Sequence, residues 1–249
     1  MTQRVLPAGY VRVSAGRSSV VVRHDLADDA RALLADGSLY EAAARDLAAR
    51  TLKGRGTAYA IALPVSGLRV VVRRNRHGGL FAPLTRDLFL PPTRAPYELG
   101  AALRLAAAGV RTPAVVMFGV DWAYVAFRRA DVVTEEILDG ADLATYMLPG
   151  VPPSQRDDAW TATITLVHAL DAAGARHHDL NVKNILLAPR DGALEAWALD
   201  VDRVRFGTPH ASGISRGNAA RLLRSARKWR DERGALFDER SAAQLVERA

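Results

Sequence analysis

The chain has 249 residues, of which 49% are hydrophobic and 24% charged, enough for one large or two small globular domains and unlike a disordered chain. It contains no cysteine, which excludes disulfides, thiolate metal sites and cysteine nucleophiles. No stretch approaches the ~18 apolar residues of a membrane span, and the N-terminus lacks the apolar core of a signal peptide, so we expect no export.

The net charge of +7 is distributed unevenly along the chain. Residues 1–120 hold 17 basic and 8 acidic side chains, residues 121–202 hold 6 and 14, and residues 203–249 hold 11 and 5. Three of the 34 basic residues are Lys, an excess of Arg that codon usage alone would explain. An acidic stretch between two basic ones indicates an anionic partner and a carboxylate-rich site.

The first predicted element is helical and spans residues 26–50. Ser38 and Glu41 have the spacing of a capping box, in which each residue satisfies a backbone N–H of the other. Apolar residues at helical spacing, ending at Leu47, predict one buried face.

Strands follow, interrupted by one helix. Residues 51–63 and 68–73 predict two strands joined by a turn. A proline near the start and a glycine past the end bracket a helix over 96–108. Residues 114–137 alternate between apolar runs and turn residues, which is typical of short strands.

The second half is mostly helical. A long helix is predicted from Ser154 to about residue 173, with Ser154 and Asp157 as its cap. Short apolar strands are predicted at 185–187 and 197–199. Mostly strands come first and mostly helices later, which places a domain boundary near Gly140.

Residues 177–187, reading HHDLNVKNILL, carry the most informative pattern. Phosphoryl transfer needs a group that orients the acceptor hydroxyl and ligands for the metal that bridges the phosphates. Asp179, on a loop after a helix, suits the first task. Asn184 and Asp200 suit the second, because Mg²⁺ prefers oxygen ligands and needs few protein carboxylates.

This pattern, H-x-D-L-x-x-x-N-I-L-L with a later Asp, resembles the catalytic and metal-binding loops of the protein-kinase-like fold. The resemblance implies an α+β, bilobal protein with the ATP site in the cleft. Residues 1–139 would form a strand-rich N-lobe with an N-terminal extension, a glycine-rich loop, a phosphate-anchoring strand and an αC-like helix. Residues 140–249 would form a helical C-lobe with the catalytic and metal-binding loops and a basic C-terminal helix.

The same resemblance implies roles for individual residues. Asp179 would accept the proton of the acceptor hydroxyl, and Asn184 and Asp200 would hold Mg²⁺. Arg73 would anchor the ATP phosphates, paired with Glu98. Arg73 stands where the fold usually has Lys, and the two side chains bind phosphate with different geometry.

Three further parts of the site are implied. Gly54 and Gly56 would form the phosphate loop, with an ordinary hairpin turn as the alternative. The backbone of Glu135 and Ile137, in an interlobe segment, would meet adenine. Lys183 would neutralise the transferred phosphate, with a solvated surface Lys as the alternative.

A narrower resemblance covers roughly residues 50–230. The segments 73–80 and 90–98, the sequence LDVDR at 199–203 and the pattern N-x-x-R-L-x-R-S at 218–225 resemble the lipopolysaccharide core kinase family. Within it the chain is most like the kinases of 3-deoxy-D-manno-octulosonic acid (Kdo). One departure is Val201, where the family usually has Phe.

This resemblance implies ATP-dependent, Mg²⁺-assisted phosphorylation of a Kdo hydroxyl on a lipid A precursor. The expected partners are a Kdo-lipid A type acceptor and the anionic inner-membrane surface, with the protein cytoplasmic and peripheral on that membrane. Arg74, Arg76 and His77 are candidates to hold the anionic sugar. A basic helix over 218–230 would either bury its apolar face in the C-lobe or contact anionic lipid.

Other functions stay open at this point. A kinase of the same fold could act on core heptose, another small molecule or a protein. A basic nucleic-acid-binding domain would explain the charge, but it would give the acidic pattern no purpose, and we expect no nucleic-acid partner. A non-catalytic binding module is favoured only by Arg73 and Val201, which depart from the residues usual at these positions.

Overall fold

The computed structural model describes residues 5–16, 18–53, 56–75, 87, 89, 93–123, 127–237 and 245. The chain divides into two compact units, residues 1–100 with 114–136 and residues 101–113 with 137–249. The division differs from the expected 139/140 boundary in assigning residues 101–113 to the second unit. Arg111 gives the reason, because its carbonyl oxygen accepts a hydrogen bond from the Ala198 N–H at 2.9 Å.

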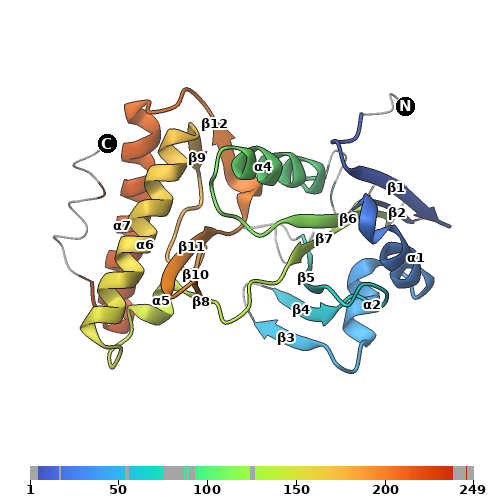
Figure 1. The fold of residues 1–249 in the computed structure, drawn as a ribbon, viewed down its shortest axis with the longest axis horizontal. Helices are drawn as coiled ribbons and strands as arrows, with labels where there is room; N and C mark the ends of the chain where they lie inside the picture. Colours follow the sequence, from blue (N-terminus) through green and yellow to red (C-terminus); the bar gives the residue numbers. More distant parts are fainter. Residues whose placement is uncertain are drawn as a thin grey trace. The chain divides into compact units, whose positions relative to one another are not determined.

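A seven-stranded sheet forms the centre of the first unit, and each neighbouring pair of strands is antiparallel. Figure 1 shows its strands in the order β1-β2-β6-β7-β5-β4-β3. Their bounds are β1 Tyr10–Ala15, β2 Ser18–Arg23, β3 Arg50–Lys53, β4 Thr57–Ala62, β5 Arg69–Arg74, β6 Val115–Trp122 and β7 Arg128–Glu135. Strands β1 and β2, which the sequence analysis did not predict, extend the sheet at β6.

Two helices, α1 (Ala27–Ala35) and α2 (Leu39–Arg45), pack on this sheet (Figure 1). The single helical segment predicted over 26–50 is therefore wrong. Gly37, with φ of +111°, separates the helices, and the predicted capping box of Ser38 and Glu41 starts the second one. Leu47 lies beyond α2 and is fully exposed rather than buried.

Alternation along the strands builds the core under these helices. On β5, Val70 and Val72 are fully buried and face the same side as the buried residues of α1 and α2. Because successive side chains on a strand point to opposite faces, Arg73 and Arg74 at its end point to different sides of the sheet.

The helix predicted over 96–108 is confirmed as α4 (Ala95–Ala107). Gly109 follows it with φ of +75°, a left-handed conformation that glycine adopts without steric cost. The expected short strands over 114–137 are two eight-residue strands, β6 and β7, with a bulge between Val115 and Met117.

The second unit combines helices with two small sheets. Its helices are α5 Leu143–Tyr146, α6 Pro153–Ala172 and α7 Ser212–Arg233, and α6 packs beside α7 (Figure 1). One sheet contains β8 Ala141–Asp142, β10 Ile185–Arg190 and β11 Ala193–Ala198; the other pairs β9 Ala175–His177 with β12 Val204–Phe206.

Two predicted helix boundaries in this unit are wrong. Helix α6 starts at Pro153 without a side-chain cap, so Ser154 and Asp157 do not cap it. Proline favours this first position because its missing N–H has no partner there in any helix. Helix α7 starts six residues before the predicted Asn218, and Leu222 and Leu223 on its predicted apolar face are buried.

Candidate active site

The loop between β9 and β10 carries the predicted catalytic aspartate. Its apolar residues Leu180 and Val182 are 1% and 0% exposed, which fixes the backbone to the core. Asp179 keeps 27% of its side-chain surface exposed. The buried apolar side chains thus anchor the loop to the core, while the Asp179 carboxylate stays partly accessible to solvent.

His177 is fully buried and braces this loop. Its Nδ1 accepts a hydrogen bond from the Asp179 backbone N–H at 3.2 Å, and its Nε2 lies 2.8 Å from the carbonyl oxygen of Leu199. A neutral imidazole that carries its proton on Nε2 satisfies both contacts. Burial lowers the pKa of His177, which keeps the ring in that neutral form.

Two asparagine side chains fix the remaining geometry. Asn181 donates to the Asp179 carbonyl oxygen at 2.9 Å and accepts from the Lys183 N–H at 2.9 Å. Asn184, which is 6% exposed, donates its Nδ2 to the same Asp179 carbonyl at 2.8 Å. With that nitrogen committed, the Oδ1 of Asn184 is the atom of this amide that suits a metal ion.

Asp200 lies beside Asn184. The β10–β11 register pairs Ile185 with Ala198, so Asn184 and the residues after Ala198 emerge at the same end of the hairpin. The Leu199 N–H donates to the Asn184 carbonyl oxygen at 2.9 Å. Asp200 itself has φ of +54°, a strained conformation for a non-glycine residue of the kind that concentrates at functional sites.

The chemistry of this donor set fits Mg²⁺. Within the part of the chain that the structure describes, no cluster of three or more His, Asp or Glu side chains could hold a metal. Mg²⁺ needs no such cluster, because it binds through one or two protein oxygens, substrate phosphates and several waters. The Asn184 amide oxygen and the Asp200 carboxylate would provide that number of ligands.

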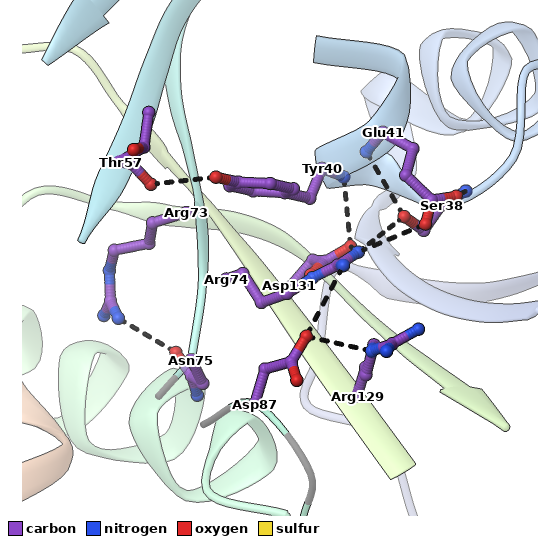
Figure 2. Close-up of polar contacts among 10 residues, drawn as sticks. All are labelled: Ser38, Tyr40, Glu41, Thr57, Arg73, Arg74, Asn75, Asp87, Arg129 and Asp131. Carbon is purple, nitrogen blue, oxygen red and sulfur yellow. Dashed lines mark hydrogen bonds and ion pairs between the residues drawn. The ribbon is translucent and has the colours of Figure 1, made fainter. Parts of the chain in front are cut away.

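The predicted pair of Arg73 and Glu98 is present as an ion pair in the first unit. Arg73 comes from β5 and Glu98 from the first turn of α4, where a carboxylate also stabilises the helix dipole. A second hydrogen bond, 2.9 Å long, joins Arg73 to the Oδ1 of Asn75 (Figure 2). The planar guanidinium makes both contacts at once.

Arg74 has a different environment, and the prediction that it holds an anionic sugar is wrong. Only 10% of its side chain is exposed, and its Nε donates to Asp131 on the neighbouring strand at 2.8 Å. Figure 2 shows it also contacting Ser38 at the start of α2 and Asp87. Burial opposes its charge, but the surrounding carboxylates, Asp131 above all, with Glu41 and Asp87, together outweigh that effect and raise the pKa of Arg74. The Arg74 charge is compensated by carboxylates of the first unit, chiefly Asp131.

Lys183, the predicted phosphate-neutralising residue, forms an ion pair with Asp142. About half of the Lys183 side chain is exposed, at 52%. Asp142 also caps α5, since its Oδ1 accepts from the Thr145 N–H at 3.1 Å. The carboxylate of this pair is therefore fixed, whereas the ammonium is at the surface.

Helix α7 supports the proposed catalytic loop through residues that the sequence pattern N-x-x-R-L-x-R-S at 218–225 contains but does not connect with Asp179. Asn218 is fully buried, accepts from the His177 N–H at 2.9 Å and donates to the Ala175 carbonyl at 2.8 Å. Arg221 lies 3.9 Å from the Asp179 carboxylate, and Ser225 accepts from the Val182 N–H at 3.3 Å. Their spacing of three and seven residues, which puts them on one helix face, was the available signal.

The predicted nucleotide contacts fall partly outside the described residues. Gly54 lies outside them, while Gly56 directly precedes β4 in the β3–β4 hairpin. Arg76 and His77, the two other candidates for holding the anionic sugar, also lie outside the described residues. Glu135 ends β7, its N–H donating to the Ala114 carbonyl at 2.9 Å.

Comparison with known protein families shows which family the chain belongs to. The model of the lipopolysaccharide kinase (Kdo/WaaP) family matches residues 42–245, which is most of the chain. The chain belongs to the lipopolysaccharide kinase (Kdo/WaaP) family. It is therefore a phosphotransferase with an alcohol group as acceptor, and the prediction of that family and enzyme class is confirmed.

Curated relatives of this Kdo/WaaP kinase are similar over most of their length. The 3-deoxy-D-manno-octulosonic acid kinase of Vibrio parahaemolyticus is 30% identical over 198 residues, covering 78% of this chain and 79% of the relative. The enzyme of the same name from Xylella fastidiosa is 31% identical over 189 residues, covering 72% and 70%.

A solved structure agrees on the fold of this Kdo/WaaP kinase. The structure of WaaP in complex with acyl carrier protein has a TM-score of 0.56 and 20% sequence identity, covering 88% of this chain and 84% of that one. This likeness confirms the predicted α+β, protein-kinase-like fold. Across the described ranges, no helix has both the length and the apolar character needed to cross a bilayer.

Proposed function

We propose that this Kdo/WaaP kinase transfers the γ-phosphate of ATP to a hydroxyl group of Kdo on a lipid A precursor. The observation that carries the proposal is the position of Asp179 on a loop braced by a neutral, buried His177 and bonded to Asn184, whose own carbonyl accepts from Leu199, the residue before Asp200. The names of the curated relatives support Kdo as the sugar.

Asp179 is the residue we assign to the acceptor. Its exposed carboxylate accepts the proton of the sugar hydroxyl as the oxygen attacks phosphorus. Three side chains fix the backbone of Asp179 and so orient its carboxylate: His177 accepts from its N–H, and Asn181 and Asn184 donate to its carbonyl oxygen. Such fixed positioning is a large part of catalysis in phosphoryl transfer, where the protein does little covalent chemistry.

The nucleotide-binding roles are assigned residue by residue, as the family resemblance implies them. Asn184 and Asp200 would hold Mg²⁺, which when bound neutralises charge on the phosphates. Arg73, oriented by Glu98, would bind the α- and β-phosphates. The backbone around Gly54 and Gly56 would cover the phosphates, and the backbone of Glu135 and Ile137 would meet adenine.

Lys183 is assigned to the transferred phosphate. Its ion pair with Asp142 is half exposed, and exposed pairs of this kind contribute about 0–1 kcal/mol. The ammonium can therefore leave a single carboxylate for a phosphate of higher charge at little cost.

We assign the site of action to the cytoplasmic face of the inner membrane. Helix α7 supports this, because a surface cavity along it is lined by four basic and two acidic residues, a net positive charge: Arg216, Arg224, Arg227 and Lys228 with Asp231 and Glu232. Basic residues near an anionic surface contribute about 1 kcal/mol each. Flotation with liposomes should increase with anionic lipid, and indifference to lipid charge would contradict the membrane assignment.

The acceptor is tested by supplying purified protein with labelled ATP, Mg²⁺ and three acceptors in parallel. These are Kdo-lipid A, a heptose-extended core and a protein mixture. The proposal predicts one phosphate added to the Kdo residue, located by mass spectrometry. Phosphate on heptose or on protein alone would establish a different acceptor for the same fold.

A further inference from the structure

Four basic side chains of the second unit form a cluster next to the proposed catalytic aspartate, which one of them, Arg221, contacts. Arg176 and Arg205 lie directly opposite each other in the β9–β12 pair. His178 follows β9, and Arg221 comes from α7 with its Nη2 3.9 Å from the Asp179 Oδ1. Like charges directly opposite on neighbouring strands destabilise a sheet, so this arrangement costs folding energy.

Arg176 is held in place by neutral groups. Its Nη1 donates to the carbonyl oxygen of Gly213 at 2.8 Å. The guanidinium lies against Gly217, where an added Cβ atom would be 0.6 Å from Nη1, so only glycine leaves room for it. Its Nε is buried and, among the residues that the structure describes, has no hydrogen-bond partner. The group is thus positioned without being neutralised by these contacts.

The basic groups act on one another. Burial lowers the pKa of His178, and the charges of Arg176, Arg205 and Arg221 lower it further. Burial and the charge of Arg221 lower the pKa of Arg176. The repulsion is a cost that a bound anion would remove.

We propose that Arg176, Arg205 and Arg221 bind a carboxylate or phosphate group of the acceptor and so place its hydroxyl at Asp179. Planar guanidinium groups match both anions through paired hydrogen bonds. The inference rests on the proposed function for the identity of the acceptor. The anion site itself is defined by the cluster alone.

Binding is tested first, without any kinase reaction. The pKa of His178 is measured by NMR in the presence of free Kdo or inorganic phosphate. An anion held by the three arginines offsets their charge, so the pKa of His178 should rise in the wild type and stay unchanged in Arg205→Gln. No change in the wild type with either anion would overturn the site. This readout is independent of whether the protein phosphorylates Kdo.

Kinetics then test the role in positioning. Arg205→Gln and Arg221→Gln should raise the KM of the Kdo-lipid A acceptor by about tenfold or more, the value of a charge-assisted hydrogen bond, with the KM of ATP unchanged. Arg190→Gln, an exposed arginine in the β10–β11 hairpin, is the control with the same charge change and should behave as the wild type. Unchanged acceptor KM in both cluster variants would overturn the proposal.

Gly217→Ala distinguishes an effect on acceptor binding from an effect on the stability of the fold. Its methyl group would displace the Arg176 guanidinium, whereas Ala in a helix interior is favoured over Gly by about 0.5–1 kcal/mol. Acceptor KM should therefore rise while the unfolding midpoint is kept. An unchanged acceptor KM in a protein of kept stability would argue against a role for Arg176.

Modified acceptors identify the anion. If the site binds the Kdo carboxylate, the KM increase in Arg205→Gln should vanish for an acceptor whose carboxylate is converted to an amide. If it binds a lipid A phosphate, the increase should vanish for the dephosphorylated acceptor. An increase that persists with both acceptors would overturn the proposal. A wild type that transfers no phosphate would instead refute the proposed function, with the His178 titration still testing the anion site.

Discussion

Arg73 and Glu98 form an ion pair of unequal burial: the carboxylate is 3% exposed, whereas 27% of the arginine side chain is accessible. The buried carboxylate depends on its partner for compensation, and the guanidinium keeps a surface that can meet a phosphate. Strand β5 presents this arginine on one face and Arg74, the partner of Asp131, on the other.

This asymmetry predicts different effects for the two halves of the pair. Arg73→Met removes the arginine that pairs with a buried carboxylate and should lower the free energy of unfolding by about 3–5 kcal/mol. Glu98→Gln removes that charge and should cost less. Arg73→Lys should raise the KM of ATP, because one ammonium cannot replace the planar fork between Asn75 and Glu98. Urea unfolding and ATP titration of the rates measure both effects.

Arg12→Met is the control for these variants, since Arg12 is exposed on β1 and its bond goes to Ser19. If Arg73→Met is as stable as this control and its KM of ATP is unchanged, the Arg73–Glu98 pair neither stabilises the fold nor binds ATP.

Two glycines with left-handed backbones form a matched test of packing. Gly109 has open space around it, whereas a Cβ atom at Gly174 would lie 2.4 Å from the carbonyl oxygen of Gly207. Gly109→Ala should cost only the backbone strain, about 1–2 kcal/mol. Gly174→Ala should cost clearly more, because backbone must move. Equal unfolding midpoints in urea for the two variants would contradict this packing.

The burial of His177 predicts a pH dependence of stability. Its pKa in the folded protein lies below the ordinary 6.5, so as pH falls below 6.5 the unfolded chain binds a proton that the folded protein does not. Stability is therefore lost toward lower pH, by at most about 1.4 kcal/mol per pH unit from this group. Urea unfolding between pH 5.5 and 7.5 should show a smaller slope in His177→Gln. An identical slope would show that the ring is not held neutral.

The metal assignment predicts how Asp200→Asn responds to Mg²⁺. Asp200 is the only carboxylate of the two proposed Mg²⁺ ligands, Asn184 and Asp200. Its loss should raise the Mg²⁺ concentration needed for half-maximal rate and lower kcat by about a hundredfold or more. A chelator should abolish the wild-type activity. Rates of Asp200→Asn that match the wild type at every Mg²⁺ concentration would be inconsistent with Asp200 as a ligand.

The sequence predicted the elements whose signals are local. The helix α4 and the capping box of α2 were found because a proline, glycines and a Ser–Glu spacing mark their ends. Strands β1 and β2 are absent from the prediction, although Val11 and Val13 alternate on β1 and three consecutive valines lie on β2, because the pairing of β2 with β6 across the chain makes them strands. Tertiary pairing of this kind leaves little trace in a local window.

The candidate site shows the same division. Asp179, Asn184 and Asp200 have a fixed spacing and were recognisable from it. The support from Asn218 and the proximity of Arg221 depend on which face of α7 meets the loop, which spacing alone does not reveal. Arg74 was a candidate for the acceptor because it follows Arg73 in a basic segment. Its actual partner, Asp131, is brought opposite it by the register of β5 with β7, which the sequence does not reveal.

The most direct test of the central claim compares the wild type with Asp179→Asn for phosphate transfer from labelled ATP to Kdo-lipid A. Asn keeps the shape of the side chain but cannot accept the hydroxyl proton, so kcat should fall by about a hundredfold to ten-thousandfold. ATP binding, measured in the same samples, should be unchanged. Undiminished transfer by Asp179→Asn would contradict the assignment of Asp179 as the proton acceptor.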